Sequence, residues 1–449
     1  MIIRNKYELS TTELRKQTLD IVEAGIAWVL PPAIMKSTVK YDPTRNILTV
    51  SNYDYHLTKS RIFVVGGGKA SGLMAETLEN IITPDNISAG VITCVSKSSD
   101  YKTSKIKIIQ AGHPVPDQRG LNGVKRMLVL KESYSINEND LVICLISGGG
   151  SALMPCPVDG VNLKHKQKIT ELLLGCGAEI HEINAVRKHL SKTKGGGLGR
   201  FYSPATVISL ILSDVIGNDL DVIASGQTSP DSSTFSDAYN VLERYDLLSR
   251  VPEGVIDCLK RGCQGEVEET AKTLSNCHNY IIGDNTLALE AMARKANEMG
   301  FTPCIVTAEQ KGDTTIVAQL RAMEILNARY TGYDIVLIGG ETTSKLPNTA
   351  GKGGRNQHYA AVSMLAMKEY EGECAVASVG TDGSDFLPGV AGAIVDNNSL
   401  SNARTKRIDV KSYLDNYDSN TLLREIGGSL IVTGNTGTNV GDVVVYALK

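Results

Sequence analysis

The sequence predicts an α/β protein built from two doubly wound domains, each with a mostly parallel sheet, and an active-site cleft between the domains. Three observations favour this fold class. Short apolar runs of β type alternate with segments of helical periodicity, which is typical of parallel sheets covered by helices on both faces. The chain has 449 residues, more than one hydrophobic core usually holds. Its 43 glycines gather directly after the β-type runs, in loops suited to close approach of the backbone.

The elements follow from periodicity and from helix start and stop signals. A first helix begins after Thr11 or Thr12, which can cap it, and ends at the proline pair 31–32. The run RIFVV, the glycines that follow it and the helical segment 70–82 predict a strand, a tight turn and a helix. The same alternation predicts further strands at 90–95, 141–146, 205–212, 279–282, 304–307, 334–338, 374–379 and 429–433.

The domain boundary is expected in the polar segment 261–276, which has few apolar residues to bury. We therefore predict an N-terminal domain over 1–265 and a C-terminal domain over 276–449. The formal net charge of -3 gives no electrostatic reason to expect nucleic acid as a partner. The nine cysteines form no C-x-x-C pair and are interpreted as reduced core thiols. Neither a signal peptide nor a membrane-spanning run is recognisable, so the cytoplasm is the predicted location.

Glycine-rich loops after strands are the first candidate binding sites, since ligands of α/β proteins lie beyond the carboxyl ends of the strands. Exposed backbone N–H groups in such loops favour anions. Four loops qualify, at 66–71, 147–152, 193–200 and 351–357. The first two supply the candidate substrate and nucleotide ligands Gly66, Gly67, Gly68, Ser71, Ser147, Gly148, Gly149, Gly150 and Ser151. The alternative for any single loop is a tight turn without a ligand.

Neither standard nucleotide fingerprint fits these loops. A Walker A loop requires Ser or Thr after its lysine, but Ala70 follows Lys69. A dinucleotide fingerprint requires a third glycine, and Ser71 stands in its place. The next strand ends in Ser96 and Lys97, without the acidic residue that would bond a ribose. These differences argue against a dehydrogenase.

Cations and carboxylates beside the loops complete the candidate site. Lys69 and Arg355 lie inside glycine loops, and helical spacing would align Asn184, Arg187 or Lys188, and Ser191 on one face. Lys194 follows in the next glycine loop, and such cations beside glycine loops suit a polyanion. Lys188 and Lys192 are interpreted as surface charges, and His181 and His189 as helix-surface residues. His113 lies in a proline-rich loop where it could touch a substrate, and it is interpreted as a structural turn residue. Carboxylates that follow strands could hold magnesium or orient a hydroxyl. Asp214 and Asp382 are the candidates for the metal, Asp214 is also a candidate catalytic residue, and Glu341 and Asn356 are further candidate ligands. Capping of turns is the alternative for both aspartates.

Taken in order, the motifs resemble those of the glycerate 2-kinase family whose C-terminal part is the MOFRL domain. The matching stretches span most of the chain, and they include VVGGGKAS, AGHPVPD, LISGGGSALMPCP, EINAVRKHLSKTKGGGL, SDVIGNDLDVIASGQT, GGETT, KGGRNQ, VGTDGSD and TGNTGTNVGD. The resemblance implies ATP- and Mg²⁺-dependent phosphorylation of D-glycerate at its 2-hydroxyl, in a cleft between two domains. It also implies that Lys69 and Arg355 are active-site residues.

Charge then suggests roles for the candidates. Arg355 or Arg187 would bind the carboxylate of glycerate, while Lys69 and the glycine loop at 147–151 would neutralise the transferring phosphoryl group. The expected partners are the small-molecule substrate and the nucleotide, with no nucleic acid, no membrane, and a homodimer left open. The sequence departs from the family pattern at Gln227, at His358 and in the segment 384–390. The alternatives are an NAD(P)-dependent hydroxypyruvate reductase and a non-catalytic phosphosugar-binding protein.

Overall fold

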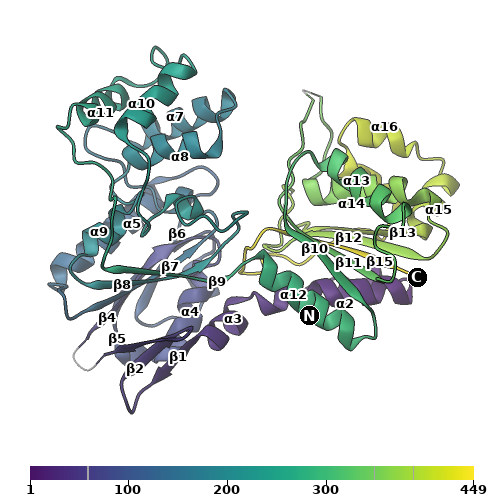
Figure 1. The fold of residues 1–449 in the computed structure, drawn as a ribbon, viewed down its shortest axis with the longest axis horizontal. Helices are drawn as coiled ribbons and strands as arrows, with labels where there is room; N and C mark the ends of the chain where they lie inside the picture. Colours follow the sequence, from purple (N-terminus) through teal and green to yellow (C-terminus); the bar gives the residue numbers. More distant parts are fainter. Residues whose placement is uncertain (58–59, 348, 388) are drawn as a thin grey trace. The chain divides into compact units, whose positions relative to one another are not determined.

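The computed structural model describes residues 1–57, 60–347, 349–387 and 389–449, and it divides the chain into two compact units. The central unit comprises Ile34–Ile282, and the terminal unit comprises Met1–Ala33 together with Gly283–Lys449. Each unit has its own six-stranded sheet with helices packed against it (Figure 1). The predicted α/β class is confirmed.

The sheet of the central unit has the order β6-β5-β4-β7-β8-β9. The pairings of β4 with β5 and β7, of β5 with β6, and of β7 with β8 are all parallel. Every residue of β4 and β7 is buried, as expected for strands covered on both faces. The strands are β4 (Ile62–Gly67), β5 (Ile87–Cys94), β6 (Ile106–Gln110), β7 (Leu141–Ser147), β8 (Thr206–Leu212) and β9 (Cys277–Gly283). All but β6 were expected from their apolar runs.

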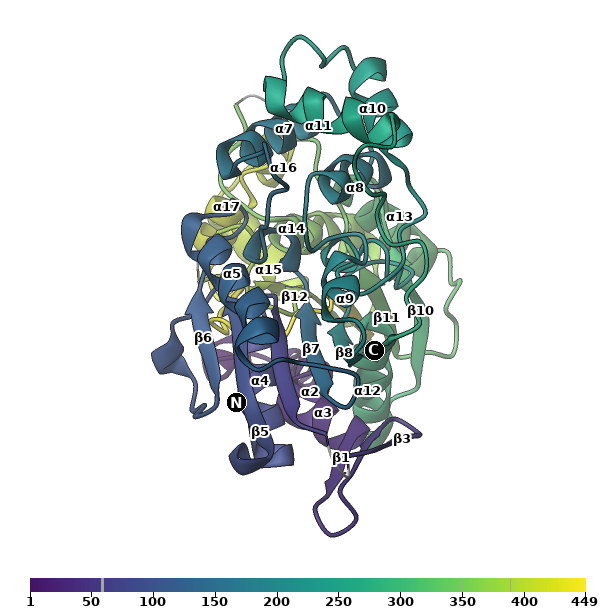
Figure 2. The same ribbon diagram turned by 90° about the vertical axis from the view of Figure 1, so that its left-hand side faces the viewer.

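The helices of the central unit fall into two groups. One group lies close to the sheet and consists of α4 (Ser71–Ile82), α5 (Gln118–Ser133), α6 (Gly150–Leu153) and α9 (Gly197–Tyr202). The other group shares a separate hydrophobic cluster and consists of α7 (Leu163–Gly175), α8 (Ile180–His189), α10 (Phe235–Arg244) and α11 (Glu253–Cys263). Figure 2 shows α7, α10 and α11 of this second group at the top of the view, above β7 and β8.

A small antiparallel sheet and short helices complete the central unit. The small sheet consists of β1 (Val39–Asp42), β2 (Ile47–Val50) and β3 (Tyr53–His56). Three 3₁₀ turns lie at η1 (Pro84–Asn86), η2 (Ser98–Asp100) and η3 (Ile223–Ser225). Helix α3 (Pro31–Thr38) spans the junction between the two units.

The sheet of the terminal unit differs from the prediction of a mostly parallel sheet. Its order is β10-β11-β15-β12-β13-β14, and among its pairings only that of β10 with β11 is parallel. The strands are β10 (Pro303–Gln310), β11 (Ile335–Gly340), β12 (Cys374–Gly380), β13 (Gly392–Asp396), β14 (Leu430–Ile431) and β15 (Asp442–Leu448). The last strand, β15, inserts antiparallel between β11 and β12, an arrangement that local periodicity cannot predict because it depends on long-range pairing.

The helices of the terminal unit cover both faces of this sheet. One face carries α2 (Glu13–Trp28) and α12 (Asn285–Glu298), with α1 (Lys6–Leu9) beside α2. The other face carries α13 (Thr314–Leu326), α14 (Arg355–Ala366), η4 (Met367–Glu369), α15 (Asn397–Thr405), α16 (Val410–Asp415) and α17 (Ser419–Ile426). Figure 1 shows α2 and α12 together beneath the sheet and α13 and α14 above it.

The N-terminal helix corrects the predicted boundaries. Helix α2 begins after Thr12, whose side chain accepts a hydrogen bond from the N–H of Arg15 at 3.2 Å, and it ends before the proline pair, as expected. It packs on α12, β12 and β15, and its buried Arg15 pairs with Asp396 at 3.3 Å. The first 33 residues therefore belong to the terminal unit, because the apolar side of α2 is buried against a sheet formed by distant sequence.

No single helix in the described part of the chain has the length and apolar character of a membrane span. Helices α2 and α3, which meet at a bend of 53°, meet those two criteria only when taken together.

Candidate active site

Two glycine loops of the central unit pack against each other at the carboxyl ends of β4 and β7. A Cβ atom on Gly66 would lie 2.2 Å from the carbonyl oxygen of Leu145, and one on Gly68 would lie 2.1 Å from Oγ of Ser147. Real Cβ atoms do not approach other atoms so closely. The predicted close approach therefore takes place, but at these glycines the approaching group is the neighbouring strand.

The backbone N–H groups of the first loop are used inside the protein. Those of Gly68, Lys69 and Ser71 donate to carbonyl oxygens, and that of Ala70 donates to Oγ of Ser147 at 3.0 Å. Ser71 is fully buried, and its hydroxyl donates to the carbonyl oxygen of Leu145 at 3.1 Å. Ser71 thus fastens the two loops together, and its side chain faces the interior.

The second loop has the geometry of an anion-binding nest. Gly149 adopts a left-handed conformation (φ 80°, ψ -7°) directly before α6, and successive residues of opposite handedness point their N–H groups into one concavity. Within the described residues, the N–H groups of Gly149, Gly150 and Ser151 have no acceptor. We call these three residues the nest.

Lys69 and His113 lie over the nest. A Cβ atom on Gly149 would be 3.2 Å from Cγ of Lys69 and 3.1 Å from Nε2 of His113. Lys69 was predicted as a site residue, whereas His113 was predicted to be a turn residue. The structure brings both side chains, from different loops, against the same glycine.

A chain of hydrogen bonds leads from the nest to two further predicted residues. Nζ of Lys194 donates to the carbonyl oxygen of Ser151 at 2.8 Å and to its Oγ at 3.0 Å. The hydroxyl of Ser225 joins Oγ of Ser151 to Oδ1 of Asn184, at 3.1 Å on each side. Asn184 and Lys194 are both buried, so the central unit gathers both residues beside the nest.

Lys166, Arg187 and Lys194 form a group of buried or half-buried cations that we call the cation cluster. Nζ of Lys166 donates to the carbonyl oxygens of Arg187 and Leu190, at 3.2 and 3.0 Å. Burial, and secondly the charge of Arg187, lower the pKa of Lys166 to about 7. Burial and the two neighbouring cations also lower the pKa of Lys194, and burial lowers that of Arg187. Desolvation without a counter-charge accounts for all three shifts.

The low pKa of Lys166 has a consequence for stability. Between about pH 7 and its ordinary value of 10.5, the unfolded chain binds a proton that the folded chain does not, so Lys166 makes stability rise with pH. We expect the free energy of unfolding of the wild type, minus that of Lys166→Met, to grow by up to ~1.4 kcal/mol per pH unit across this window. Urea unfolding at pH 7, 8 and 9 measures this difference. A difference independent of pH would contradict the assigned shift, and exposed Lys192→Met serves as the control.

Two residues predicted to lie on the surface are buried. Lys188 is 2% exposed and pairs with Asp221 and, at 3.2 Å, with Asp231. His189 is also buried, with Nε2 at 2.6 Å from Glu269. Helical periodicity alone misplaced both because a second layer of helices, α10 and α11, covers this part of α8. The expectation for Lys192 is confirmed, since it is exposed and pairs with Asp159 at 2.7 Å.

Arg355, the second predicted cation, lies at the start of α14 in the terminal unit. Its guanidinium donates twice to Asp442, at 2.5 and 3.1 Å, and pairs with Glu341 at 2.5 Å. Burial by itself would lower the pKa of Arg355, but the charges of Asp442 and Glu341 raise it above its ordinary value. Arg355 is therefore charged at every relevant pH, and two carboxylates hold it in place.

Asp385 closes the N-terminus of the same helix. Its carboxylate accepts hydrogen bonds from the N–H groups of Asn356 and Gln357, at 3.0 and 2.8 Å. Burial, together with the charge of Asp442, raises the pKa of Asp385 to about 6 despite these bonds. The predicted ligand Asn356 is buried, with Nδ2 toward Asp385 and Oδ1 accepting from Ser378. Its side chain therefore organises the start of α14 from within.

The two predicted metal ligands lie in different units. Asp214 follows β8 in the central unit, and Asp382 follows β12 in the terminal unit. Oδ1 of Asp382 and Oδ1 of Asp442 each lie 3.5 Å from the position of a Cβ on Gly380. In the described ranges, no group of three or more His, Cys, Asp and Glu side chains is arranged to hold a metal ion.

Two departures from the family pattern, Gln227 and His358, are side chains that make hydrogen bonds inside the protein. Gln227 is buried, and its Nε2 donates to the carbonyl oxygen of Ala224 at 3.2 Å. The ring of His358 lies between Ser419 and Thr315, at 2.8 and 2.9 Å, and burial lowers its pKa to about 4, so it is neutral. In the segment 384–390, Phe386 is 84% exposed, and position 388 lies outside the described residues.

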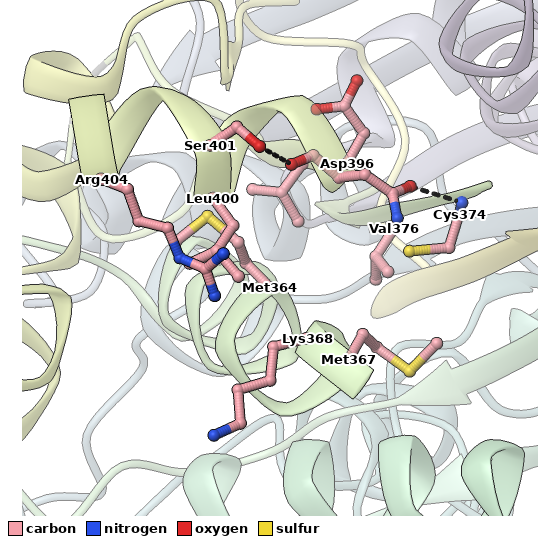
Figure 3. Close-up of a pocket in the computed structure, with 11 residues that line it drawn as sticks. Met364, Met367, Lys368, Cys374, Val376, Asp396, Leu400, Ser401 and Arg404 are labelled. Carbon is pink, nitrogen blue, oxygen red and sulfur yellow. Dashed lines mark hydrogen bonds between the residues drawn. The ribbon is translucent and has the colours of Figure 1, made fainter. Parts of the chain in front are cut away.

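A cavity of about 170 Å³ in the terminal unit is separate from all predicted site residues. It lies between α14, α15 and the strands β12 and β13, with Met364 and Leu400 in its wall and Lys368 and Arg404 at one side (Figure 3).

Three residues of these clusters were missed or only partly recognised by sequence analysis. Lys166 lies in an ordinary charged stretch of α7, so no local signal marks it. Asp442 ends the quoted motif TGNTGTNVGD but was not singled out, although an acidic residue beside glycines was a usable signal. His113 was considered in its proline-rich loop, but only the fold places it beside Lys69.

Together, the fold and these clusters define an α/β protein with a candidate anion site at the carboxyl edge of a parallel sheet. Residues 17–260 match the model described as a domain of unknown function (DUF4147), and residues 334–442 match the MOFRL family. The chain belongs to the glycerate 2-kinase family that combines these two parts.

The relatives agree with this assignment. A glycerate 2-kinase of Pyrococcus horikoshii is 37% identical over 96% of this chain and 97% of its own length. The crystal structure of a glycerate kinase from Thermotoga maritima superposes with a TM-score of 0.84 at 35% identity, covering 97% of this chain and 100% of that one. A protein of Agrobacterium vitis named as a putative hydroxypyruvate reductase is 36% identical over 85% of this chain and 98% of its own.

Proposed function

We propose that this protein transfers a phosphoryl group from ATP to the 2-hydroxyl of D-glycerate and so forms 2-phosphoglycerate. The observation that carries the proposal is the nest, whose three N–H groups lack an acceptor among the described residues and lie beneath Lys69 and His113. Such a concavity with a cation beside it suits a phosphate group. The glycerate kinases among the relatives support the choice of acceptor.

The proposed roles follow from charge. Lys69 and the nest stabilise the negative charge on the equatorial oxygens of the transferring phosphoryl group, which is the main task of a phosphotransferase. Arg355 is the second cation of the proposal, and Asp442 and Glu341 hold its guanidinium in one orientation in the terminal unit.

Mg²⁺ fits this donor set if it arrives with the nucleotide. Magnesium is usually held by one or two carboxylates together with substrate phosphates, not by a cage of protein ligands alone. The described residues contain no such cage, whereas Asp214 and Asp382 each offer one carboxylate after a strand. The bound ion would neutralise charge on the phosphates. A supporting result would be activity that is lost with a chelator and restored by excess Mg²⁺.

The hydroxypyruvate reductase alternative has less support. In the position of the third fingerprint glycine, Ser71 is buried and bonded to the neighbouring strand, and the N–H groups of that loop are used internally. A pyrophosphate would therefore find no free donors there. Incubation of the protein with hydroxypyruvate and NADH is expected to leave the NADH absorbance unchanged.

The reaction is tested by phosphorus NMR of the product made from D-glycerate and Mg-ATP. A phosphate on the 2-oxygen is three bonds from a single proton, so its proton-coupled signal is a doublet, whereas a phosphate on the 3-oxygen couples to two protons. We expect the doublet together with the signals of ADP. The 3-phospho pattern would refute the assigned regiochemistry, and unchanged ATP would refute the kinase proposal.

A further inference from the structure

The cation cluster of Lys166, Arg187 and Lys194 has no counter-charge among the described residues. None of its members lies within salt-bridge distance of a carboxylate there, although Lys188, next in sequence to Arg187, is held by two. Desolvated cations without partners are costly and lower each other's pKa values. An unbalanced buried cluster of this kind is expected where an anionic ligand supplies the missing charge.

The donors of the cluster are also only partly used. Nε of Arg187 donates to Oγ1 of Thr170 at 3.4 Å, and within the described residues its two terminal nitrogens have no acceptor. Nδ2 of Asn184 is buried and likewise has no partner, although buried side-chain donors are normally satisfied. A guanidinium fork with a free amide beside it matches the two oxygens of a carboxylate.

The position of the cluster relates it to the nest. Nζ of Lys194 donates to the carbonyl oxygen of Ser151 at 2.8 Å, and Ser151 is the last residue of the nest, so the cluster and the nest are in direct contact. In a 2-hydroxy acid the carboxylate and the reacting hydroxyl are on adjacent carbons. A carboxylate held at the cluster would therefore place its hydroxyl toward the nest and Lys69.

We propose that Lys166, Arg187, Lys194 and Asn184 form the subsite for the carboxylate of the hydroxy acid substrate, with Lys166 acting as a positioning residue for Arg187. This inference rests on the proposed function for the identity of the acid. The sequence left open whether Arg187 or Arg355 binds the carboxylate of the substrate. The inference selects Arg187, because Arg355 is already paired with Asp442 and Glu341. Lys166 and Lys194 are 6% and 2% exposed, so the subsite suits one compact anionic group better than a solvated polyphosphate.

The direct test is calorimetric binding to the nucleotide-free full-length protein, with D-glycerate, glycerol and inorganic phosphate as separate probes. We expect D-glycerate to bind and glycerol, which lacks the carboxylate, not to bind. Arg187→Met should weaken D-glycerate binding by about tenfold to a hundredfold, the usual effect of losing a charge-assisted pair of hydrogen bonds. Arg187→Lys should bind with intermediate affinity, and exposed Lys192→Met should bind like the wild type.

Kinetics distinguish a carboxylate subsite from a nucleotide subsite. Arg187→Met should raise the KM for D-glycerate at least tenfold, and Arg187→Lys and Lys166→Met should raise it by a smaller factor. The KM for ATP should stay within about twofold in all three variants, since each interaction is made with only one substrate. A rise in the KM for ATP with unchanged D-glycerate binding would overturn the proposal, as would unchanged D-glycerate binding in folded Arg187→Met.

The positioning role of Lys166 has its own readout. The groups that face its Nζ are Arg187 and Lys194 within the cluster and the thiols of Cys156 and Cys258. A bound anion favours the charged form of the lysine, so the wild type should take up protons when it binds D-glycerate near pH 7.5, detected as heats that depend on the buffer. Lys166→Met should show less uptake, and an equal uptake in both proteins would overturn this role.

The two proposals can fail separately. If the wild type shows no turnover but binds D-glycerate and loses this binding in Arg187→Met, the carboxylate subsite stands and the kinase proposal fails. If turnover is normal and Arg187→Met binds D-glycerate like the wild type, the kinase proposal stands and the subsite fails.

Discussion

Replacement of Lys69 by methionine is expected to lower kcat by about 10²–10³-fold while leaving the fold intact. The Cγ atom of Lys69 lies over Gly149, where the N–H groups of the nest converge. In the proposed reaction its charge acts on the transferring phosphoryl group, and the largest gain comes as negative charge develops in the transition state. Methionine keeps the length and apolar stem of the side chain and removes only the cation.

Steady-state kinetics with both substrates varied, together with a thermal melt, measure this prediction. A loss in kcat with little change in the KM for D-glycerate is expected, since the carboxylate is assigned to the cation cluster. Lys192→Met is the matched control, because it removes an exposed lysine of the same unit. Turnover of Lys69→Met within a few-fold of the wild type would refute the role of this residue.

The largest effect on stability is expected from Lys188→Met, which should lower the free energy of unfolding of the central unit by about 3–5 kcal/mol. Asp231, whose side chain is fully buried, would lose its cation. Burial by itself would raise the pKa of Asp231, but in the wild type Lys188 and the hydrogen bonds from Ser233 hold it below its ordinary value. Removal of one partner leaves the other charge uncompensated in a poorly solvated interior.

Urea unfolding followed by far-UV circular dichroism measures this loss. The double variant Lys188→Met/Asp231→Asn should recover part of it, because both buried charges are then gone. Lys192→Met, whose partner Asp159 is 95% exposed on its side chain, should change stability by less than ~1 kcal/mol. Equal losses of stability in Lys188→Met and Lys192→Met would show that the buried ion pair contributes no more to stability than the exposed one.

Much of the parallel sheet followed from the sequence because its strands are continuous apolar runs. The runs ending at Gly67 and Ser147 form β4 and β7 as expected, and the glycines after them mark the edge where the site lies. The edge strand β6 was missed because its run is short and includes Lys107 and Gln110. Strand β15 carries a strong β signal, VVVY, but its antiparallel insertion depends on pairing with β11 and β12 from far along the chain.

Residues of the candidate site could be predicted where a charged or amide side chain lies in or beside a glycine-rich motif. Lys69, Asn184, Arg187 and Lys194 were each predicted from motifs, and all four lie in the central unit. Asn184 and Lys194 are linked to Ser151, Lys69 contacts Gly149, and Arg187 lies in the cation cluster with Lys194. Local sequence could not show that the glycines of the first loop serve strand packing, whereas the second loop has N–H groups without an acceptor among the described residues. That difference depends on which neighbouring atoms accept each hydrogen bond.

The sequence by itself determined the fold class and the family, because periodicity, glycine placement and motif order are local properties. It also supplied most charged residues of the proposed site. The tertiary structure alone decided which cations have counter-charges. The sequence alone does not distinguish Arg187 from Arg355. In the structure, Arg355 is held between two carboxylates, and Arg187 is not. The reason is that the electrostatic state of a side chain is set by its burial and its neighbours, and both come from segments far away in the chain.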